Sequence, residues 1–255
     1  YSEVKLSSAV GATEKYINLV GASNYLALGG PDGLLDKIFL MSYDYWGGWD
    51  TVLGHQTNLF GDSIDYPNYT DSEGKVVETN SAENAINLLV DMGVEKSRMM
   101  LGIANYSRGK QASAIGTDGD PFSATGVSNA VVFGTWEGTV LEGYDLFANV
   151  AGPDMKGVNN FKLFTDTNNN TDYYYNPVSG VYHSIDTPRT AALKTKYAVN
   201  NGLRGVFVWT VEQDYQGLIA DTVNHNLGHT IAGDGAYSVA EIESLSSTCG
   251  DNVNV

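Results

Sequence analysis

Polar and aromatic side chains crowd into residues 43–50, directly after a short apolar run at residues 38–41. The run is too short for a helix and is bounded by turn residues, so it predicts a strand buried on both faces, as in a parallel sheet. A phenol at Tyr43, a carboxylate at Asp44 and an indole at Trp49 follow at once. Such groups at the carboxyl end of a buried strand are typical of the binding face of a barrel enzyme. Core aromatics at a strand end are the structural alternative.

Two neighbouring motifs carry a family resemblance. Residues 41–47 read Met-Ser-Tyr-Asp-Tyr-Trp-Gly, and residues 53–59 read Leu-Gly-His-Gln-Thr-Asn-Leu. Together they resemble the sixth-strand signature of the glycoside hydrolase family 18 chitinases, in particular those of the bacterial chitinase A type. The resemblance runs from about residue 5 to about residue 228. It implies an α/β fold: a (β/α)8 TIM barrel, of which this chain would hold strands five to eight, with an α+β chitinase insertion domain between strands seven and eight.

The order of the remaining elements fits this fold. Apolar runs at residues 99–104 and 205–209 predict two further buried strands, and alternation at residues 3–10 predicts another. Spacing and capping residues predict helices over residues 14–27, 81–92, 187–201 and 222–227. Between residue 110 and about residue 184, strands and helices no longer alternate regularly. We therefore expect barrel segments at residues 1–110 and 185–229, the insertion domain at residues 111–184, and a linker at residues 230–255.

Four strands make about half of such a barrel. Half a barrel leaves two open edges on a parallel sheet, which soluble proteins rarely tolerate. The chain also starts without Met and without a signal peptide. We therefore expect a fragment of a longer, secreted protein, with the amino-terminal half of the barrel supplied by upstream residues or by a separate chain.

Charge and composition narrow the class of partner. A formal net charge of −16 argues against nucleic acid or an anionic membrane, because phosphate would be repelled. A neutral polysaccharide is compatible with this charge, and the resemblance points to chitin or chitooligosaccharide. Cys249 is the single cysteine, so neither an internal disulfide nor a thiolate metal cluster can form.

The family resemblance implies hydrolysis with retention by substrate assistance. The N-acetyl carbonyl of the sugar attacks its own anomeric carbon, while a glutamic acid protonates the leaving oxygen. That acid closes an Asp-x-x-Asp-x-Asp-x-Glu motif, which this sequence lacks, so we expect this chain alone to be inactive. Two catalytic residues of the family are present by resemblance. Tyr43 would hold the N-acetyl carbonyl by a hydrogen bond, and Asp44 would bond sugar hydroxyls or the amide near the cleavage point.

Four further residues match positions that bind substrate in the family. Met41 would line the pocket under the acetamide, and Trp209 would form the floor under the distorted sugar, since an indole offers an apolar platform to sugar C–H groups. Tyr106 and Arg108 would border the cleft, with Ser107 in place of the usual glycine between them. Core packing is the alternative for Met41 and Trp209, and a surface ion pair is the alternative for Arg108.

Three more aromatic or acidic residues complete the predicted site. Trp49 takes the place of an aromatic residue on the leaving-group side. Residues 134–138 read Gly-Thr-Trp-Glu-Gly. By resemblance, Trp136 would stack on a sugar on the non-reducing side and Glu137 would hydrogen-bond it. Trp46 fits this region or the hydrophobic core equally well.

No metal or cofactor is expected. Residues 166–172 place oxygens at alternate positions, as a calcium loop does. However, Thr171 stands where such a loop needs its turn glycine, and Pro177 stands where it needs the bidentate glutamate. A solvated turn is the better interpretation of this segment.

Three functions fit these observations. The first is a chitinase whose general acid lies outside this sequence. The second is a catalytically inactive chitinase-like protein that only binds chitin. The third is a subunit of a toxin complex, in which a half-barrel associates with a separate chain. The presence of the missing glutamate upstream would separate the first two.

Overall fold

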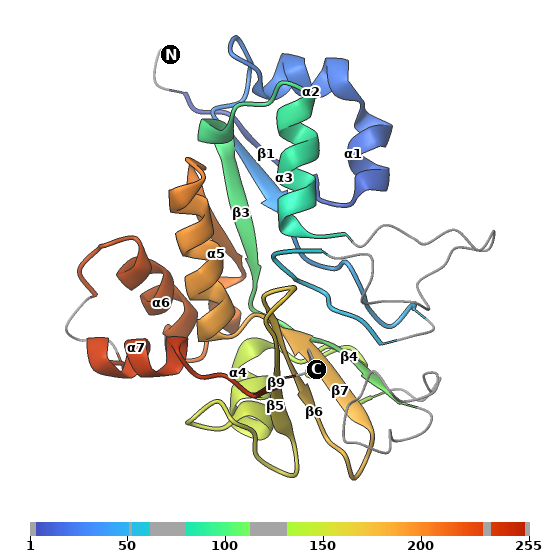
Figure 1. Cartoon of the computed structure of the whole chain (residues 1–255), viewed down its shortest axis with the longest axis vertical. Coiled ribbons are helices and arrows are strands. Elements are labelled where there is room, and N and C mark those ends of the chain that lie inside the picture. The colour runs from blue at the N-terminus through green and yellow to red at the C-terminus, as the bar shows by residue number, and fades with distance from the viewer. Residues whose placement is uncertain (1–3, 51–52, 62–79, 113–131, 232–235, 253–255) are drawn as a thin grey trace.

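Two β-sheets organise the chain, as Figure 1 shows for a computed structural model that describes residues 4–50, 53–61, 80–112, 132–231 and 236–252. The first sheet is parallel, with the order β1 (Ser7–Gly11), β2 (Lys37–Met41), β3 (Met99–Ala104) and β8 (Gly205–Trp209). The second has the order β4 (Arg108–Gln111), β7 (Val181–Ile185), β6 (Thr171–Tyr175), β5 (Lys162–Asp166) and β9 (Asp251–Asn252). The predicted α/β class is confirmed. Within the described residues, however, the parallel sheet stays open and does not close into a barrel.

Helices pack against the parallel sheet. They are α1 (Glu14–Val20), α2 (Ala22–Gly29), α3 (Ala82–Asp91), α5 (Pro188–Asn200) and α6 (Leu218–Asn226), with short turns η1 (Lys96–Arg98) and η4 (Val211–Gln213). The strand expected to be buried on both faces, β2, buries Ile38 and Leu40 fully, whereas Phe39 and Met41 are half-buried. Helix α5 lies along β3 and β8 (Figure 1). Thr187 caps this helix, as predicted, and the structure adds a reciprocal capping box with Thr190; Pro188 occupies the first turn. No described helix has the length and apolar character that crossing a bilayer requires.

Two helices differ from their predicted bounds. The helix expected over residues 14–27 is divided in two, because Gly21 adopts φ 83° and ends α1 before α2 begins. The helix expected over residues 222–227 begins at Leu218 instead. The Asp214 carboxylate accepts hydrogen bonds from Ile219 N and Ala220 N, each at 2.9 Å, and thereby satisfies the first turn.

The tail expected to be a linker, residues 230–255, forms a helix and a short strand in the part that the structure describes. Helix α7 (Val239–Ser246) packs on α5 and α6, and its Ile242 side chain is fully buried. Beyond α7, β9 pairs in parallel with β5. The described part of this tail therefore packs on the rest of the chain through α7 and β9 instead of extending away from it.

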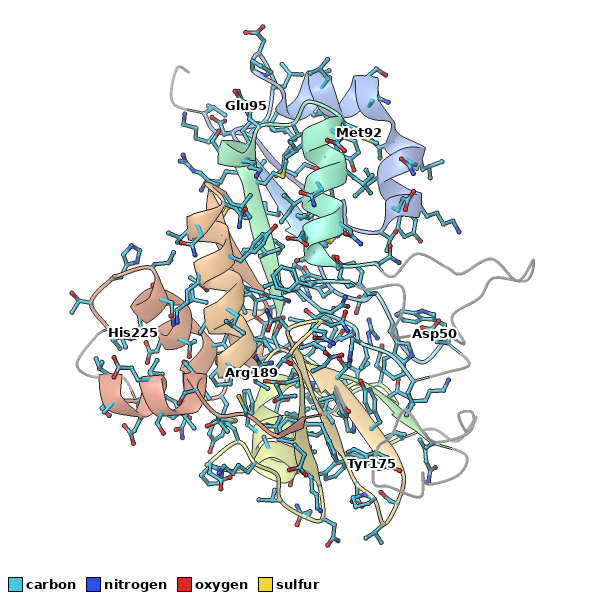
Figure 2. The ribbon with its side chains drawn as sticks, viewed as in Figure 1. Asp50, Met92, Glu95, Tyr175, Arg189 and His225 are labelled. Atoms are coloured by element: carbon cyan, nitrogen blue, oxygen red, sulfur yellow. The ribbon has the colours of Figure 1, made fainter. Side chains whose placement is uncertain are left out.

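The second sheet and the helices on the parallel sheet share one hydrophobic core. The second sheet is mainly antiparallel and buries an aromatic cluster that includes Tyr173, Tyr182 and Trp46. A short helix α4 (Gly143–Leu146) and a π-helical turn η3 (Phe147–Ala151) precede its central strands. Arg189 lies where α5 meets this sheet (Figure 2), and its Nη2 is 2.8 Å from a buried Asp172 oxygen. This buried ion pair ties α5 to the second sheet.

Candidate functional site

An open cleft of about 530 Å³ lies at the carboxyl ends of the parallel strands. Eight of the nine predicted site residues line it: Met41, Tyr43, Asp44, Tyr106, Arg108, Trp136, Glu137 and Trp209. The ninth, Trp49, is not part of this lining but contacts it, because the Arg108 guanidinium lies 5.2 Å from the centre of the Trp49 ring. Segments far apart in the chain therefore meet at the carboxyl ends of the strands, as expected for a parallel sheet.

The turn after β2 presents the first of these groups. Ser42 is buried and exchanges two hydrogen bonds with Gly102 of β3: its Oγ accepts from Gly102 N at 3.0 Å and donates to Gly102 O at 2.9 Å. This side chain continues the strand pairing by one residue. Asp44 then adopts φ 60°, which turns the chain away from the sheet. Tyr43 and Asp44 thereby lie in the cleft, just beyond the carboxyl end of β2.

A buried ion pair beneath the turn stabilises the same strand ends. Asp186 Oδ2 accepts hydrogen bonds from Ala104 N at the end of β3, from Thr57 Oγ and from Lys194 Nζ, at 2.7–2.8 Å. Both charged side chains are fully buried. Removing one partner of such a pair would leave the other charge uncompensated, so the pair holds the strand ends in place.

The Tyr43 hydroxyl lies at the cleft without a partner of its own in the described part of the chain. It is buried and has no hydrogen-bond partner among the described residues, although its residue lines the cleft. Burial, and next the negative charge of Asp44, raises the pKa of Tyr43. The phenol therefore keeps its proton at neutral pH. An unsatisfied buried donor is costly, and a ligand acceptor in the cleft would remove that cost.

Asp44 stands at the centre of a hydrogen-bond network in the cleft. Its Oδ1 accepts from Tyr106 OH at 2.7 Å and from Arg108 Nε at 2.8 Å, and its Oδ2 accepts from Arg108 Nη2 at 3.0 Å. Burial, followed by the Asp44 charge, raises the pKa of Tyr106 far above its ordinary value. The Arg108 guanidinium also reaches Glu137 at 3.3 Å. Arg108 is thus both a wall of the cleft and a member of an ion pair.

The indoles of the cleft are exposed rather than packed in the core. Trp209, at the end of β8, is 55% exposed and Trp136 is 82% exposed. Within the part of the chain that the structure describes, Trp209 is therefore not packed in the core. Trp46, by contrast, is 1% exposed and packs edge-on against Tyr182 at 5.3 Å, so it belongs to the core of the second sheet. Flat exposed indoles beside polar groups are suited to hold the C–H faces of sugars.

The comparisons with known proteins agree with this geometry. Residues 2–214 match the model of a family described as glycosyl hydrolases family 18. The chain belongs to glycosyl hydrolase family 18.

Named relatives of this family 18 chain are chitinases. Chitinase 2 of Yersinia entomophaga is 36% identical over 200 residues, which cover 76% of this chain and 29% of the relative. Chitinase A of Pseudoalteromonas piscicida is 29% identical over 276 residues, covering 99% and 32% respectively. The crystal structure of chitinase Chi1, fitted into the Yersinia entomophaga toxin complex, superposes with a TM-score of 0.73 at 24% identity, covering 95% of this chain and 44% of that chain. The family 18 chain spans about a third of the length of the two curated relatives.

Three residues of the cleft escaped the analysis of the sequence: Val140, Glu142 and Gln213. Gln213 Nε2 donates to Glu142 Oε1 at 3.4 Å, which joins the loop after β8 to the segment after Trp136. Glu142 also forms an isolated backbone bridge with Tyr106. No local pattern marks either residue, because both reach the cleft through contacts with distant segments.

Residues 166–172, the segment compared above with a calcium loop, contain two aspartates that bond to other side chains of this family 18 chain. Asp166 contacts His55 Nε2 at 3.1 Å and accepts from the Asn169 side chain at 2.8 Å. Burial opposes ionisation of Asp166, but these contacts hold its pKa well below the ordinary value. Asp172 points instead toward Arg189. Within the described ranges, no group of three potential ligand side chains is arranged to hold a metal ion.

Proposed function

We propose that this chain forms the substrate-positioning half of a chitinase that cleaves β-1,4 links between N-acetylglucosamine units. The observation that carries the proposal is the unpartnered Tyr43 hydroxyl in the cleft beside Asp44. In substrate-assisted hydrolysis, the sugar's own N-acetyl carbonyl oxygen bonds to the anomeric carbon as the leaving oxygen departs with a proton from a glutamic acid. Tyr43 would donate to that carbonyl and hold it in line. The acid itself lies outside this sequence, so this chain alone would be inactive.

The other lining residues supply binding. Trp209 and Trp136 expose indole faces on which sugar rings would stack. Met41 would pack under the acetamide methyl group, and Glu137 would accept from a sugar hydroxyl. Arg108 and Tyr106 would border the cleft while Asp44 keeps them oriented.

A complete site would need the other half of the barrel. Within the described residues, β1 and β8 each pair on one side only, which leaves two open sheet edges. Apolar side chains near these edges are exposed, namely Leu6 at 53% and Val211 at 73%. We infer that these four strands are the fifth to eighth of a TIM barrel, that the second sheet is its insertion domain, and that strands one to four cover the open edges. Upstream residues of a secreted protein would supply those strands.

A separate amino-terminal chain is the second candidate source, as in a toxin complex. A structural neighbour, chitinase Chi1, is described in the setting of such a complex. Size-exclusion chromatography of the protein isolated from its source separates the two possibilities. A single polypeptide that holds all eight strands would support upstream residues, whereas a complex of this chain with a second polypeptide would support a separate partner.

Two measurements test the proposed function. Chitohexaose binding to the full-length protein, measured by calorimetry, should weaken about tenfold or more on Trp209→Ala, because stacking an apolar sugar face on an indole accounts for a large part of such binding. Tyr16→Ala, which removes a 55% exposed aromatic outside the cleft, is the matched control. Release of shorter oligosaccharides by the same protein then separates a chitinase from an inactive chitin-binding relative. Loss of affinity equal in both variants would exclude this cleft as the binding site.

A further inference from the structure

Lys110 is a buried cation whose acceptors are backbone carbonyls. The residue lies on β4 and is 6% exposed, and its Nζ donates to Gly48 O at 2.5 Å and to Asp50 O at 3.0 Å. Among the described residues it forms no ion pair with a carboxylate. A buried ammonium group is costly unless it is hydrogen-bonded. The two carbonyls therefore stabilise Lys110, and Lys110 in turn fixes where they lie.

Those two carbonyls belong to the residues on either side of Trp49. The loop of residues 47–50 is also closed on itself: Asp50 N donates to Gly47 O at 3.0 Å, and Gly47 N donates to Asp50 Oδ2 at 2.9 Å. Both carbonyls bound by Lys110 thus flank the indole in the chain. The backbone on both sides of Trp49 is therefore fixed by the hydrogen bonds of the turn and by the two hydrogen bonds from Lys110.

Arg108 holds the face of the same indole. It is two residues before Lys110 on β4, so their side chains leave the strand on the same side. The guanidinium lies over the Trp49 ring at 5.2 Å, within the range of a cation–π contact. At Gly47 an added Cβ would lie 2.6 Å from the ring, so only glycine lets the indole fold back this closely. Trp49 nevertheless stays 60% exposed beside the cleft.

We propose that Lys110 is a positioning residue that holds the loop of residues 47–50 so that Trp49 stands as a sugar platform next to Arg108. The proposal rests on the proposed function of the cleft and extends it to a residue that would not itself touch sugar. Without the ammonium group, the loop would keep its turn but lose the two hydrogen bonds that attach its backbone to β4. Binding of a long oligosaccharide would then include the cost of ordering Trp49.

A double-mutant cycle on the full-length protein tests this role, with chitohexaose as the ligand. Lys110→Met should weaken binding about three- to tenfold, which is the cost of ordering a freed aromatic side chain and its loop. In a Trp49→Ala background the same change should have no further effect. Lys162→Met, which removes an exposed lysine of the same sheet, is the control and should bind normally. Equal losses in both backgrounds would overturn the positioning role, because a general structural defect does not depend on Trp49.

A second measurement needs no ligand. With 5-fluorotryptophan incorporated, Trp49→Phe identifies the Trp49 resonance by its loss. Lys110→Met should shift or broaden that resonance and leave those of Trp136 and Trp209 in place. An unchanged Trp49 resonance would overturn the inference. Absence of chitohexaose binding by the unaltered protein, in contrast, would overturn the proposed function while this spectrum still reported on Lys110.

Discussion

Asp44 and Arg108 form a bidentate ion pair in the lining of the cleft, with Oδ1 2.8 Å from Nε and Oδ2 3.0 Å from Nη2. The two residues come from different elements, the turn after β2 and the strand β4. Planar guanidinium and carboxylate groups match in this geometry, which fixes their relative orientation as well as their distance. Tyr106 adds a third bond to the same carboxylate. Asp44 therefore fixes the orientation of Tyr106 and Arg108 in the cleft before a ligand binds.

Replacing Asp44 with Asn should weaken oligosaccharide binding about tenfold. Asn keeps the shape but loses the charge and one acceptor, and hydrogen bonds to charged groups contribute about 1.5–3 kcal/mol. Titration calorimetry with chitohexaose measures the loss. Glu243→Gln is the matched control, because Glu243 does not belong to the cleft lining and its side chain is 62% exposed, so only a small effect is expected. Equal affinity of the Asp44→Asn variant would show that the network does not organise the cleft.

Replacing Tyr43 with Phe should lower turnover of the full-length protein about 100-fold, as loss of one oriented donor commonly does. The ring remains to fill its buried position, so the free energy of unfolding should change little. Steady-state hydrolysis of a chitooligosaccharide measures the effect, and thermal unfolding serves as the control for folding. Turnover equal to that of the unaltered protein would remove Tyr43 from the mechanism.

Stability should fall as the pH falls from about 6.5 to about 4 because of His183. Burial lowers the pKa of His183 to about 4, from an ordinary value of 6.5. Between these values the unfolded state binds the extra proton, so acidification favours unfolding, by about 3 kcal/mol once pH 4 is reached. Urea unfolding at several pH values measures this slope. A His183→Asn variant should lose this part of the slope, and an identical slope in both proteins would contradict the assignment to His183.

Replacing Ser107 with Gly should destabilise the junction between the sheets by about 2 kcal/mol. Ser107 Oγ accepts from Leu141 N at 3.1 Å and lies 3.0 Å from His183 Nδ1, all in a buried setting. The glycine leaves both partners unsatisfied, at a cost of about 1–3 kcal/mol for a buried group. Chemical denaturation measures the change. Ser8→Ala, on an exposed hydroxyl of β1, should stay within about 0.5 kcal/mol. A loss no larger than that of the control would show that the Ser107 hydroxyl is not needed.

The Ser107 contact also explains a departure from the family motif. The sequence shows only that a serine replaces glycine between Tyr106 and Arg108. In the folded chain its hydroxyl faces His183 on β7, 76 residues away, and so joins the cleft wall to the second sheet. Substitution and partner are too far apart in the chain for a local pattern to reveal that they belong together.

Local patterns along the chain are enough to predict the class of fold, the positions of the strands in the parallel sheet and the types of side chain that follow them. An apolar run buries a strand, and the residues after it must emerge at the end of that strand. The motifs likewise mark Tyr43, Asp44 and Trp209 as site residues. Helix α5 is readable from its capping residue and the proline that follows.

Which of these side chains become partners depends on the three-dimensional fold. The fold pairs Asp44 with Arg108, leaves Trp209 exposed while burying Trp46, places Lys110 beneath Trp49, and brings the tail back as α7 and β9. Each of these outcomes depends on contacts between segments separated by many residues. The free energy of such a contact is set by packing and desolvation in the assembled fold, and neither is encoded in the spacing of residues along the chain.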